Sequence, residues 1–284
     1  MIEVVDTGAL LTIQDLGRPG HASLGVSLSG AVDRRALRRA NVAVGNRPGA
    51  AGLETTLTGA VLRALAPLVV AVTGADASVF VGDVPVRLGR PLRLATGQVL
   101  EVGAAVDGAR SYVAVRGGID AAPVLGSRST DVLSGIGPAP LAAGDRLLVG
   151  PSAAPDQDLF AAPSTAFADL PGDGPTLRLL PGPRADWLAD PGALRDATFT
   201  ASPRSNRVGL RLEGDALERA RDDELASEGI VAGAVQLPPS GLPVVFLADH
   251  PTTGGYPVIG VLASASLALA AQTAPGTQVR FTLA

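Results

Sequence analysis

Short hydrophobic runs separated by glycine-containing turns make up much of the chain after residue 54. Four such runs are Leu68–Val72, Ser78–Val81, Gln98–Val102 and Ser111–Val115. Short strands with turns at regular intervals are typical of β-sandwiches and β-barrels, whereas parallel sheets alternate strands with crossover helices. The pattern therefore predicts a mainly β protein.

The hydrophobic spacing changes between residues 33 and 44. Here apolar residues recur at helical spacing, at Ala36, Leu37, Ala40 and Val44. Gly45 is a suitable end for this helix. The same segment carries four arginines, for which a solvated helix face is the favoured interpretation and an acidic partner surface the alternative. A second short helix is expected near Asp215–Arg221.

A chain of 284 residues suits two domains of ordinary size. Residues 151–175 are rich in proline, alanine and aspartate, and we expect a linker there. The predicted domains are an N-terminal β-barrel over 1–150, with one helix and a polar, glycine-rich loop near its start, and a C-terminal β-barrel over 176–284.

The charge and the hydropathy pattern exclude several classes of partner. The formal net charge is −4, with 23 basic and 27 acidic residues, so no nucleic-acid-binding surface is indicated. We find no apolar stretch of bilayer-spanning length and no signal-peptide pattern at the N-terminus. A cytoplasmic protein without membrane contact is the expectation.

Two residue types are missing, and their absence limits the chemistry. Without cysteine there is no thiol nucleophile and no zinc–thiolate site. Without lysine there is no Schiff base, no P-loop lysine and no biotin attached to this chain. The two histidines are His21 and His250, and no metal-ligand spacing occurs, so we expect no metal site.

A polar, glycine-rich segment at Thr252–Tyr256 is the first candidate for ligand binding. Adjacent glycines let backbone N–H groups approach a ligand closely. The two threonine hydroxyls, the Tyr256 phenol and the nearby Asp249 carboxylate add hydrogen-bonding groups. Together they would hold a carboxylate, a carbonyl or a phosphate. The alternative is a tight hairpin with polar turn residues.

A second glycine-rich tract near the N-terminus contains Gln14, Asp15, Arg18 and His21. Arg18 is suited to pair with a carboxylate or phosphate, while Asp15 would otherwise hold Arg18 or a turn in place. His21 has the side chain best suited to proton transfer near neutral pH, although an ordinary exposed surface histidine is the favoured interpretation. The segment Gly126–Thr130 has the composition of a phosphate-binding loop but lacks the lysine and spacing of a Walker motif.

These tracts, with others in the same order along the chain, resemble the family of 5-oxoprolinase C subunits, also called the biotin-dependent carboxyltransferase or allophanate hydrolase subunit 2 family. The matching blocks are Thr12–Gly20, Gly25-Val26, Ser29–Ala31, Asp33, Ala40-Asn41, Val44–Asn46, Leu53-Glu54, Gly126–Asp131, Ser227–Gly229, Gln236–Pro238 and Thr252–Pro257. The chain departs from the family pattern at Ser27, where proline is common. His250-Pro251 is not typical of the family, and we assign His250 no catalytic role.

The resemblance implies two cyclophilin-like β-barrel domains and a complex with partners similar to the A and B subunits of 5-oxoprolinase. Such a complex opens the small-molecule substrate 5-oxoproline to glutamate with ATP hydrolysis, so ATP is the expected cofactor, bound by this chain or by a partner protein. Two alternatives remain open. One is the carboxyltransferase component of a biotin-dependent urea or amide carboxylase, and the other is a non-catalytic regulatory subunit.

Membership of the matching blocks also implies most of the site residues, and the polar segments at Ser205–Leu212 and just before Thr252 supply Asn206, Arg207 and Asp249. The candidates for proton transfer are Asp15, Glu54 and Asp249. The candidates for substrate binding are Gln14, Arg18, Ser29, Arg128, Asn206, Arg207, Gln236, Thr252, Thr253, Gly254, Gly255 and Tyr256. Among these, Arg18, Arg128 and Arg207, with the backbone donors around Gly254, would stabilise anionic groups.

Overall fold

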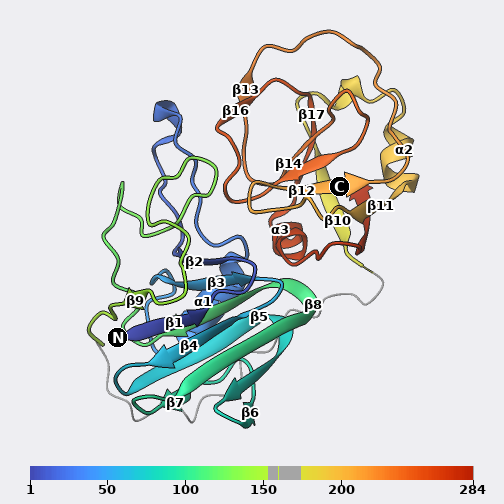
Figure 1. Cartoon of the computed structure of the whole chain (residues 1–284). Helices are drawn as coiled ribbons and strands as arrows, with labels where there is room; N and C mark the ends of the chain where they lie inside the picture. Colours follow the sequence, from blue (N-terminus) through green and yellow to red (C-terminus); the bar gives the residue numbers. More distant parts are fainter. Residues whose placement is uncertain (153–158, 160–173, 284) are drawn as a thin grey trace. The chain divides into compact units, whose positions relative to one another are not determined.

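The computed structural model describes residues 1–152, 159 and 174–283. The chain divides into two compact units, which are described separately below (Figure 1). Unit 1 comprises Met1–Arg18 and Ser29–Asp169, and unit 2 comprises Pro19–Leu28 and Leu170–Ala284. Most of the predicted linker at 151–175 lies outside the described residues. The predicted domain ranges stay predictions.

The described part of unit 1 is built on a nine-stranded antiparallel sheet that forms a half-barrel. Its strands follow the order β2-β3-β8-β4-β1-β9, and β5 pairs with β6, β7 and β8. The strand bounds are β1 Ile2–Asp6, β2 Leu11–Gln14, β3 Gly52–Thr56, β4 Ala60–Ala64, β5 Leu68–Val81, β6 Val84–Val86, β7 Leu92–Leu94, β8 Val99–Val115 and β9 Arg146–Leu147.

Strands β5 and β8 are longer than the sequence pattern indicates. The runs predicted as separate short strands join into one 14-residue strand and one 17-residue strand. The register between them shifts at three places between Gly74 and Val79. A β-bulge accommodates an extra residue without ending the pairing of two strands. The two strands therefore stay paired at glycine and aspartate positions where the sequence pattern predicts that a strand ends.

The two faces of the central strands bury different clusters. Val72 and Val113 point into the main core of the sheet, while Ala71 and Tyr112 face helix α1, Arg34–Ala43. This helix confirms the one predicted from residues 33–44. Its N-cap is Asp33, whose side chain accepts hydrogen bonds from the N–H groups of residues 35 and 36.

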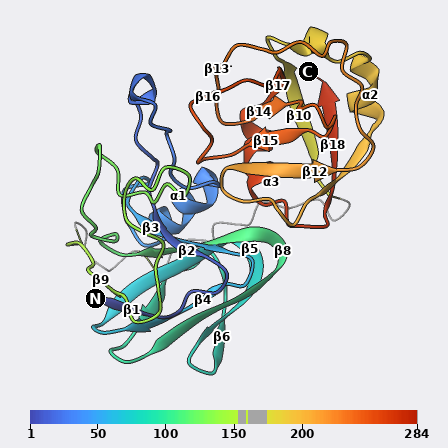
Figure 2. The same ribbon diagram turned by 45° about the horizontal axis from the view of Figure 1, so that its top comes forward.

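Unit 2 contains a closed seven-stranded barrel (Figure 2). Around the barrel the strands run β10 Thr176–Pro181, β17 Val258–Leu262, β14 Ala234–Gln236, β15 Val244–Phe246, β12 Gly209–Glu213, β11 Thr198–Ala201 and β18 Gln278–Leu283. The parallel pairing of β10 with β18 closes the ring. Phe199 and Phe281 meet edge to face inside it, with ring centroids 6.0 Å apart.

Short elements surround the barrel. They are the 3-10 helices η1 Ala22–Leu24 and η2 Ala185–Trp187, the helices α2 Pro191–Asp196 and α3 Ser264–Ala271, and the two-stranded ladder of β13 Glu228–Gly229 with β16 Thr253–Gly254. The prediction of a helix near Asp215–Arg221 is wrong, because these residues form no helix in the structure. A segment this short gains little from helix formation, and its backbone instead bonds to neighbouring segments, for example from Leu217 N to Gly241 O at 2.9 Å.

The predicted fold class, mainly β with barrels and few short helices, is confirmed. Strands account for 38% of the chain and helices for 11%. Among the described helices, none is both long and apolar enough to cross a bilayer.

Candidate functional site

The carboxylate of Asp15 links two loops of unit 1. Asp15 lies directly after β2, and its Oδ1 accepts hydrogen bonds from Gly17 N at 2.8 Å, Ser127 Oγ at 2.6 Å and Ser129 Oγ at 2.5 Å. Its Oδ2 accepts from Arg128 N at 2.7 Å. One side chain thus joins the N-terminal glycine-rich loop to the segment Gly126–Asp131. Ser127 in this segment follows Asp15 by 112 residues in the sequence.

Gln14 and Arg18 hold the same segment at neighbouring carbonyl groups. Gln14 Nε2 donates to Thr130 O at 2.9 Å and to Thr12 Oγ1 at 3.0 Å. Arg18 Nη2 donates to Ser129 O. Both side chains are buried, and Arg18 is only 1% exposed. The sequence therefore brings Gln14, Asp15 and Arg18 together with Ser129 and Thr130 in one polar cluster.

Several polar atoms of this cluster have no hydrogen-bond partner among the described residues. They are Nε and Nη1 of Arg18, Oε1 of Gln14 and Oγ1 of Thr130. Buried polar groups in folded proteins are nearly always paired, so a group of unpaired ones calls for an explanation. The Arg18 donors stand out, because the ion pairs in the described part of unit 1 do not include Arg18 and the Asp15 oxygens accept from other groups.

Glu54 anchors the loop before α1 to the sheet. From β3, its Oε2 accepts hydrogen bonds from Val32 N at 3.0 Å and from the Tyr112 hydroxyl at 2.8 Å, and its Oε1 lies 3.9 Å from Arg110 Nε. The Tyr112 oxygen in turn accepts from Asp33 N at 2.7 Å. Burial, followed by the negative charges of Glu54 and Asp33, raises the pKa of Tyr112 well above its usual value.

Ser29 and Arg128 lie at the edge of the same cluster. Ser29 is buried in a left-handed backbone conformation, with φ of 52°, and its hydroxyl donates to Thr130 O at 3.3 Å. The backbone N–H of Arg128 donates a hydrogen bond to Asp15 Oδ2. Its partly exposed side chain places Nη2 3.2 Å from Asp120 Oδ1. The side chain of Arg128 thus has an acidic partner already.

The segment Gly126–Asp131 does not fit a nucleotide phosphate. Five of its six backbone N–H groups have acceptors elsewhere in the chain or in the segment itself: Ser127 N bonds to Val124 O, Arg128 N to Asp15, Ser129 N to Ser127 Oγ, Thr130 N to Ile13 O and Asp131 N to Ile136 O. Phosphate-binding loops instead aim free N–H groups at the ligand. Within the described ranges there is also no group of three acidic or histidine side chains placed to hold a metal ion.

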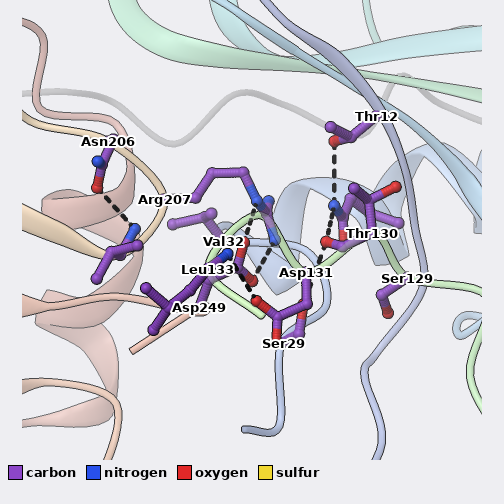
Figure 3. Close-up of polar contacts among 12 residues, drawn as sticks. Thr12, Ser29, Val32, Ser129, Thr130, Asp131, Leu133, Asn206, Arg207 and Asp249 are labelled. Carbon is purple, nitrogen blue, oxygen red and sulfur yellow. Dashed lines mark hydrogen bonds and ion pairs between the residues drawn. The ribbon is translucent and has the colours of Figure 1, made fainter. Parts of the chain in front are cut away.

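Arg207 and Asp249 form a buried ion pair in unit 2. Arg207 Nε lies 2.8 Å from Asp249 Oδ2, and Nη2 lies 2.9 Å from Oδ1, a two-pronged arrangement drawn in Figure 3. Neither side chain is more than 1% exposed. Asn206 stabilises the adjoining turn, since its Oδ1 accepts from Val208 N at 2.9 Å and Gly209 N at 3.2 Å.

The segment Thr252–Tyr256 is tied into the short β13–β16 ladder. Thr252 O accepts from Ile230 N at 2.9 Å, and Gln236 Nε2 donates to Tyr256 O at 3.0 Å. Gly254 is needed for packing, because a Cβ there would come within 2.5 Å of Ile230 Cδ1. Gly255 and the half-exposed Tyr256 line a cavity of about 660 Å³, whose other walls are Arg219, Asp222, Asp223, Glu224, Leu225 and Pro239.

The histidines show no catalytic arrangement in the described residues. His250 is buried, its Nδ1 lies 2.7 Å from Pro251 O, and its ring meets Phe246 edge to face. His21 stands at the N-cap of η1 without a side-chain capping bond.

A family model described as the carboxyltransferase domain, subdomains A and B, matches residues 24–283. The chain belongs to this carboxyltransferase-domain family.

Curated relatives of this carboxyltransferase-domain protein include two proteins named as the C subunit of 5-oxoprolinase. The one from Escherichia coli is 37% identical over 286 residues, which cover 99% of this chain and 90% of the relative. The one from Haemophilus influenzae is 32% identical, with the same coverage.

Among solved structures, the urea amidolyase of K. lactis contains a region similar to this carboxyltransferase-domain protein. The TM-score is 0.90 at 30% identity, and the match covers 99% of this chain but 18% of the amidolyase chain. The likeness therefore concerns one portion of a much longer protein.

The predicted site residues of this carboxyltransferase-domain protein fall into three groups. In unit 1 the structure brings together Gln14, Asp15, Arg18, Ser29 and Arg128, with Glu54 in the adjoining network. In unit 2 it places Asn206, Arg207 and Asp249 in one group and Gln236 with Thr252–Tyr256 in another. Sequence reasoning missed Tyr112, whose hydroxyl lies in a mainly hydrophobic run, and Thr12, a lone threonine in β2.

Proposed function

We propose that this carboxyltransferase-domain protein is one subunit of a 5-oxoprolinase, an enzyme complex that opens 5-oxoproline to glutamate with ATP hydrolysis. The observation that carries the proposal is the match to the C subunit of Escherichia coli 5-oxoprolinase, which extends over 99% of this chain and 90% of the relative. The name of that relative supports a complex, and we infer partners similar to the A and B subunits. We expect the complex to act in the cytoplasm.

In this proposal the polar cluster of unit 1 binds the substrate. Of the three arginines predicted to hold anions, Arg207 pairs with Asp249, and Arg128 pairs with Asp120. Arg18 keeps unpaired donors at Nε and Nη1. A buried guanidinium with free donors is suited to a carboxylate, because charge-assisted hydrogen bonds are strongest away from water.

ATP, in the same proposal, is bound by a partner protein. This chain has no lysine, and five of the six backbone N–H groups of the segment Gly126–Asp131 have acceptors within the chain. The residues present therefore do not fit a phosphate cradle at that segment. Isolated chain should show no ATP binding by calorimetry, whereas the assembled complex should bind it.

We assign a positioning function to the three acidic residues first predicted to transfer protons. The carboxylates of Asp15 and Glu54 accept hydrogen bonds from other groups of the chain, and the carboxylate of Asp249 forms an ion pair with Arg207. A group used in this way fixes loops and side chains around a ligand. Their predicted role in proton transfer stays a prediction.

A second candidate function is the carboxyltransferase component of a biotin-dependent urea or amide carboxylase. The observation favouring it is the TM-score of 0.90 against the urea amidolyase structure. Since this chain lacks lysine, the carboxybiotin would come from another protein.

Reconstitution tests these functions directly. The chain is mixed with its A-like and B-like partners, 5-oxoproline and ATP, and glutamate is measured by chromatography, with each protein omitted in turn. The proposal predicts glutamate only when this chain is present. An intact complex that forms no glutamate would overturn the proposal, and biotin-dependent carboxylation of urea would favour the second candidate.

A further inference from the structure

Four buried polar atoms of three neighbouring side chains in unit 1 have no hydrogen-bond partner among the described residues. Arg18 contributes the donors at Nε and Nη1, Gln14 the acceptor Oε1, and Thr130 the hydroxyl Oγ1. Gln14 and Thr130 are fully or almost fully buried, as is Arg18. Without a ligand, the positive charge of Arg18 would stay buried without an acidic partner, an arrangement that proteins avoid.

The surrounding contacts fix this guanidinium in place. Ser129 O accepts from Nη2, and Gly137 lies against the same pair, since a Cβ at Gly137 would come within 2.0 Å of Ser129 O and 3.0 Å of Arg18 Nη2. The preceding residue, Gly17, donates its N–H to Asp15. The Arg18 guanidinium is therefore anchored at Nη2, while Nε and Nη1 have no partner among the described residues.

The unpaired atoms specify the chemistry of the ligand. Either unpaired Arg18 donor can bond one carboxylate oxygen beside the positive charge, and Gln14 Oε1 accepts a hydrogen bond from an N–H group. Gln14 and Arg18 bond to the carbonyls of the adjacent residues Thr130 and Ser129, so both side chains are anchored on the same short stretch of backbone. The Thr130 hydroxyl is available to a carbonyl oxygen or a second carboxylate oxygen.

We propose that Arg18, Gln14 and Thr130 form a binding site for a small carboxylic acid that carries an amide N–H next to its carboxylate. This inference rests on the proposed function, because 5-oxoproline is such a molecule. It goes further in placing the substrate's carboxylate on Arg18 and its lactam N–H on Gln14, within unit 1.

Calorimetry with three probes tests the site on the full chain, alone and with its partner proteins. The probes are 5-oxoproline, 2-pyrrolidinone, which lacks the carboxylate, and N-methyl-5-oxoproline, which lacks the N–H. We expect 5-oxoproline to bind, 2-pyrrolidinone to bind about tenfold to a hundredfold more weakly, and the N-methyl compound to be weakened as well. Equal binding of 5-oxoproline and 2-pyrrolidinone, or no binding in either form of the protein, would overturn the inference.

An Arg18→Met variant separates binding from a structural role, with the exposed Arg35→Met as its matched control. Binding of 5-oxoproline should fall at least tenfold in Arg18→Met, while Tm stays constant or rises, because an uncompensated buried charge is removed. Unchanged binding would refute the site. If this variant does not fold, Arg18→Lys keeps the charge without the planar fork and should still weaken binding, whereas unchanged binding would again refute the site.

The test also separates this inference from the proposed function. Glutamate formation by a complex in which this chain shows no preference for the carboxylate would reject the site and leave the function standing. Carboxylate-dependent binding without glutamate formation by the intact complex would leave the site standing and reject the function.

Discussion

At the scale of single residues, this protein uses acidic side chains to hold loops, and two donor atoms of the buried Arg18 have no partner among the described residues. Asp15 accepts four hydrogen bonds and Glu54 two, so their charge stabilises the native arrangement of unit 1. Among the described residues, Ser129 O is the acceptor found for Arg18, which carries five N–H donors. This imbalance is the basis for placing the substrate carboxylate on Arg18.

Replacing Asp15 should therefore destabilise unit 1 strongly. Asp15→Ala leaves the hydroxyls of Ser127 and Ser129 and two backbone N–H groups without their acceptor, and we expect unfolding to become easier by roughly 2–4 kcal/mol. Urea denaturation followed by circular dichroism measures this change. Asp120→Ala, which removes an exposed partner of Arg128, is the control and should cost less than about 1 kcal/mol. Equal effects would contradict the linking role of Asp15.

The raised pKa of Tyr112 predicts a loss of stability in alkali. The unfolded chain releases the tyrosine proton near the usual pKa of 10.0, while folded Tyr112 keeps it. Above pH 10 the folded state thus binds more protons, and the free energy of unfolding falls as pH rises; below pH 10 the contribution is constant. Denaturation curves between pH 8 and 11 should show this fall in the wild type and a smaller one in Tyr112→Phe. Parallel pH profiles would disagree with the proposed environment of Tyr112.

At the scale of elements, the sequence pattern predicts helices and strands whose hydrophobic spacing is regular. It does not predict the length of strands that continue through β-bulges. Helix α1 follows from the spacing of Ala36, Leu37 and Ala40, which pack on the sheet. The lengths of β5 and β8 do not follow, because bulges between Gly74 and Val79 continue the pairing through apparent breaks. Gln14, Asp15 and Arg18 lie close together in one glycine-rich tract of the sequence, with Gln14 at the end of β2, but their meeting with Ser129 depends on long-range packing that local patterns do not encode.

The β13–β16 ladder gives an element-scale prediction about glycine. Gly254→Ala should displace Ile230 and destabilise the protein by about 1–3 kcal/mol, because the new Cβ would overlap the isoleucine side chain. Gly229→Ala in the paired strand is the control, since a Cβ there meets nothing within 4 Å, and it should change stability by less than about 0.5 kcal/mol. Thermal denaturation of both variants measures the difference; a tolerated Gly254→Ala would show that the segment Thr252–Tyr256 is loosely packed.

At the scale of the whole molecule, two compact units carry separate polar groups. Unit 1 holds the Arg18 cluster on a half-barrel, and unit 2 holds the Arg207–Asp249 pair on a closed barrel. The alternating hydrophobic runs predict this mainly β design well. They do not predict that Arg207 and Asp249, 42 residues apart, meet inside unit 2, because strand order in a barrel is set by pairing between distant segments.

The buried pair also bears on the stability of unit 2 as a body. Arg207→Met leaves the carboxylate of Asp249 buried without its cation, and we expect a loss of about 3–5 kcal/mol. Arg221→Met, which removes an exposed partner of Asp186, should cost less than about 1 kcal/mol. Guanidinium denaturation of the two variants compares these values, and a mild effect of Arg207→Met would mean that water reaches Asp249.

Steady-state kinetics of the assembled complex with wild-type or Arg18→Met chain is the most direct test of the account. Glutamate formation is followed at saturating ATP while the 5-oxoproline concentration is varied. If Arg18 binds the substrate carboxylate, the variant complex assembles normally and its KM for 5-oxoproline rises at least tenfold. Identical KM and kcat values for the two complexes would contradict the account.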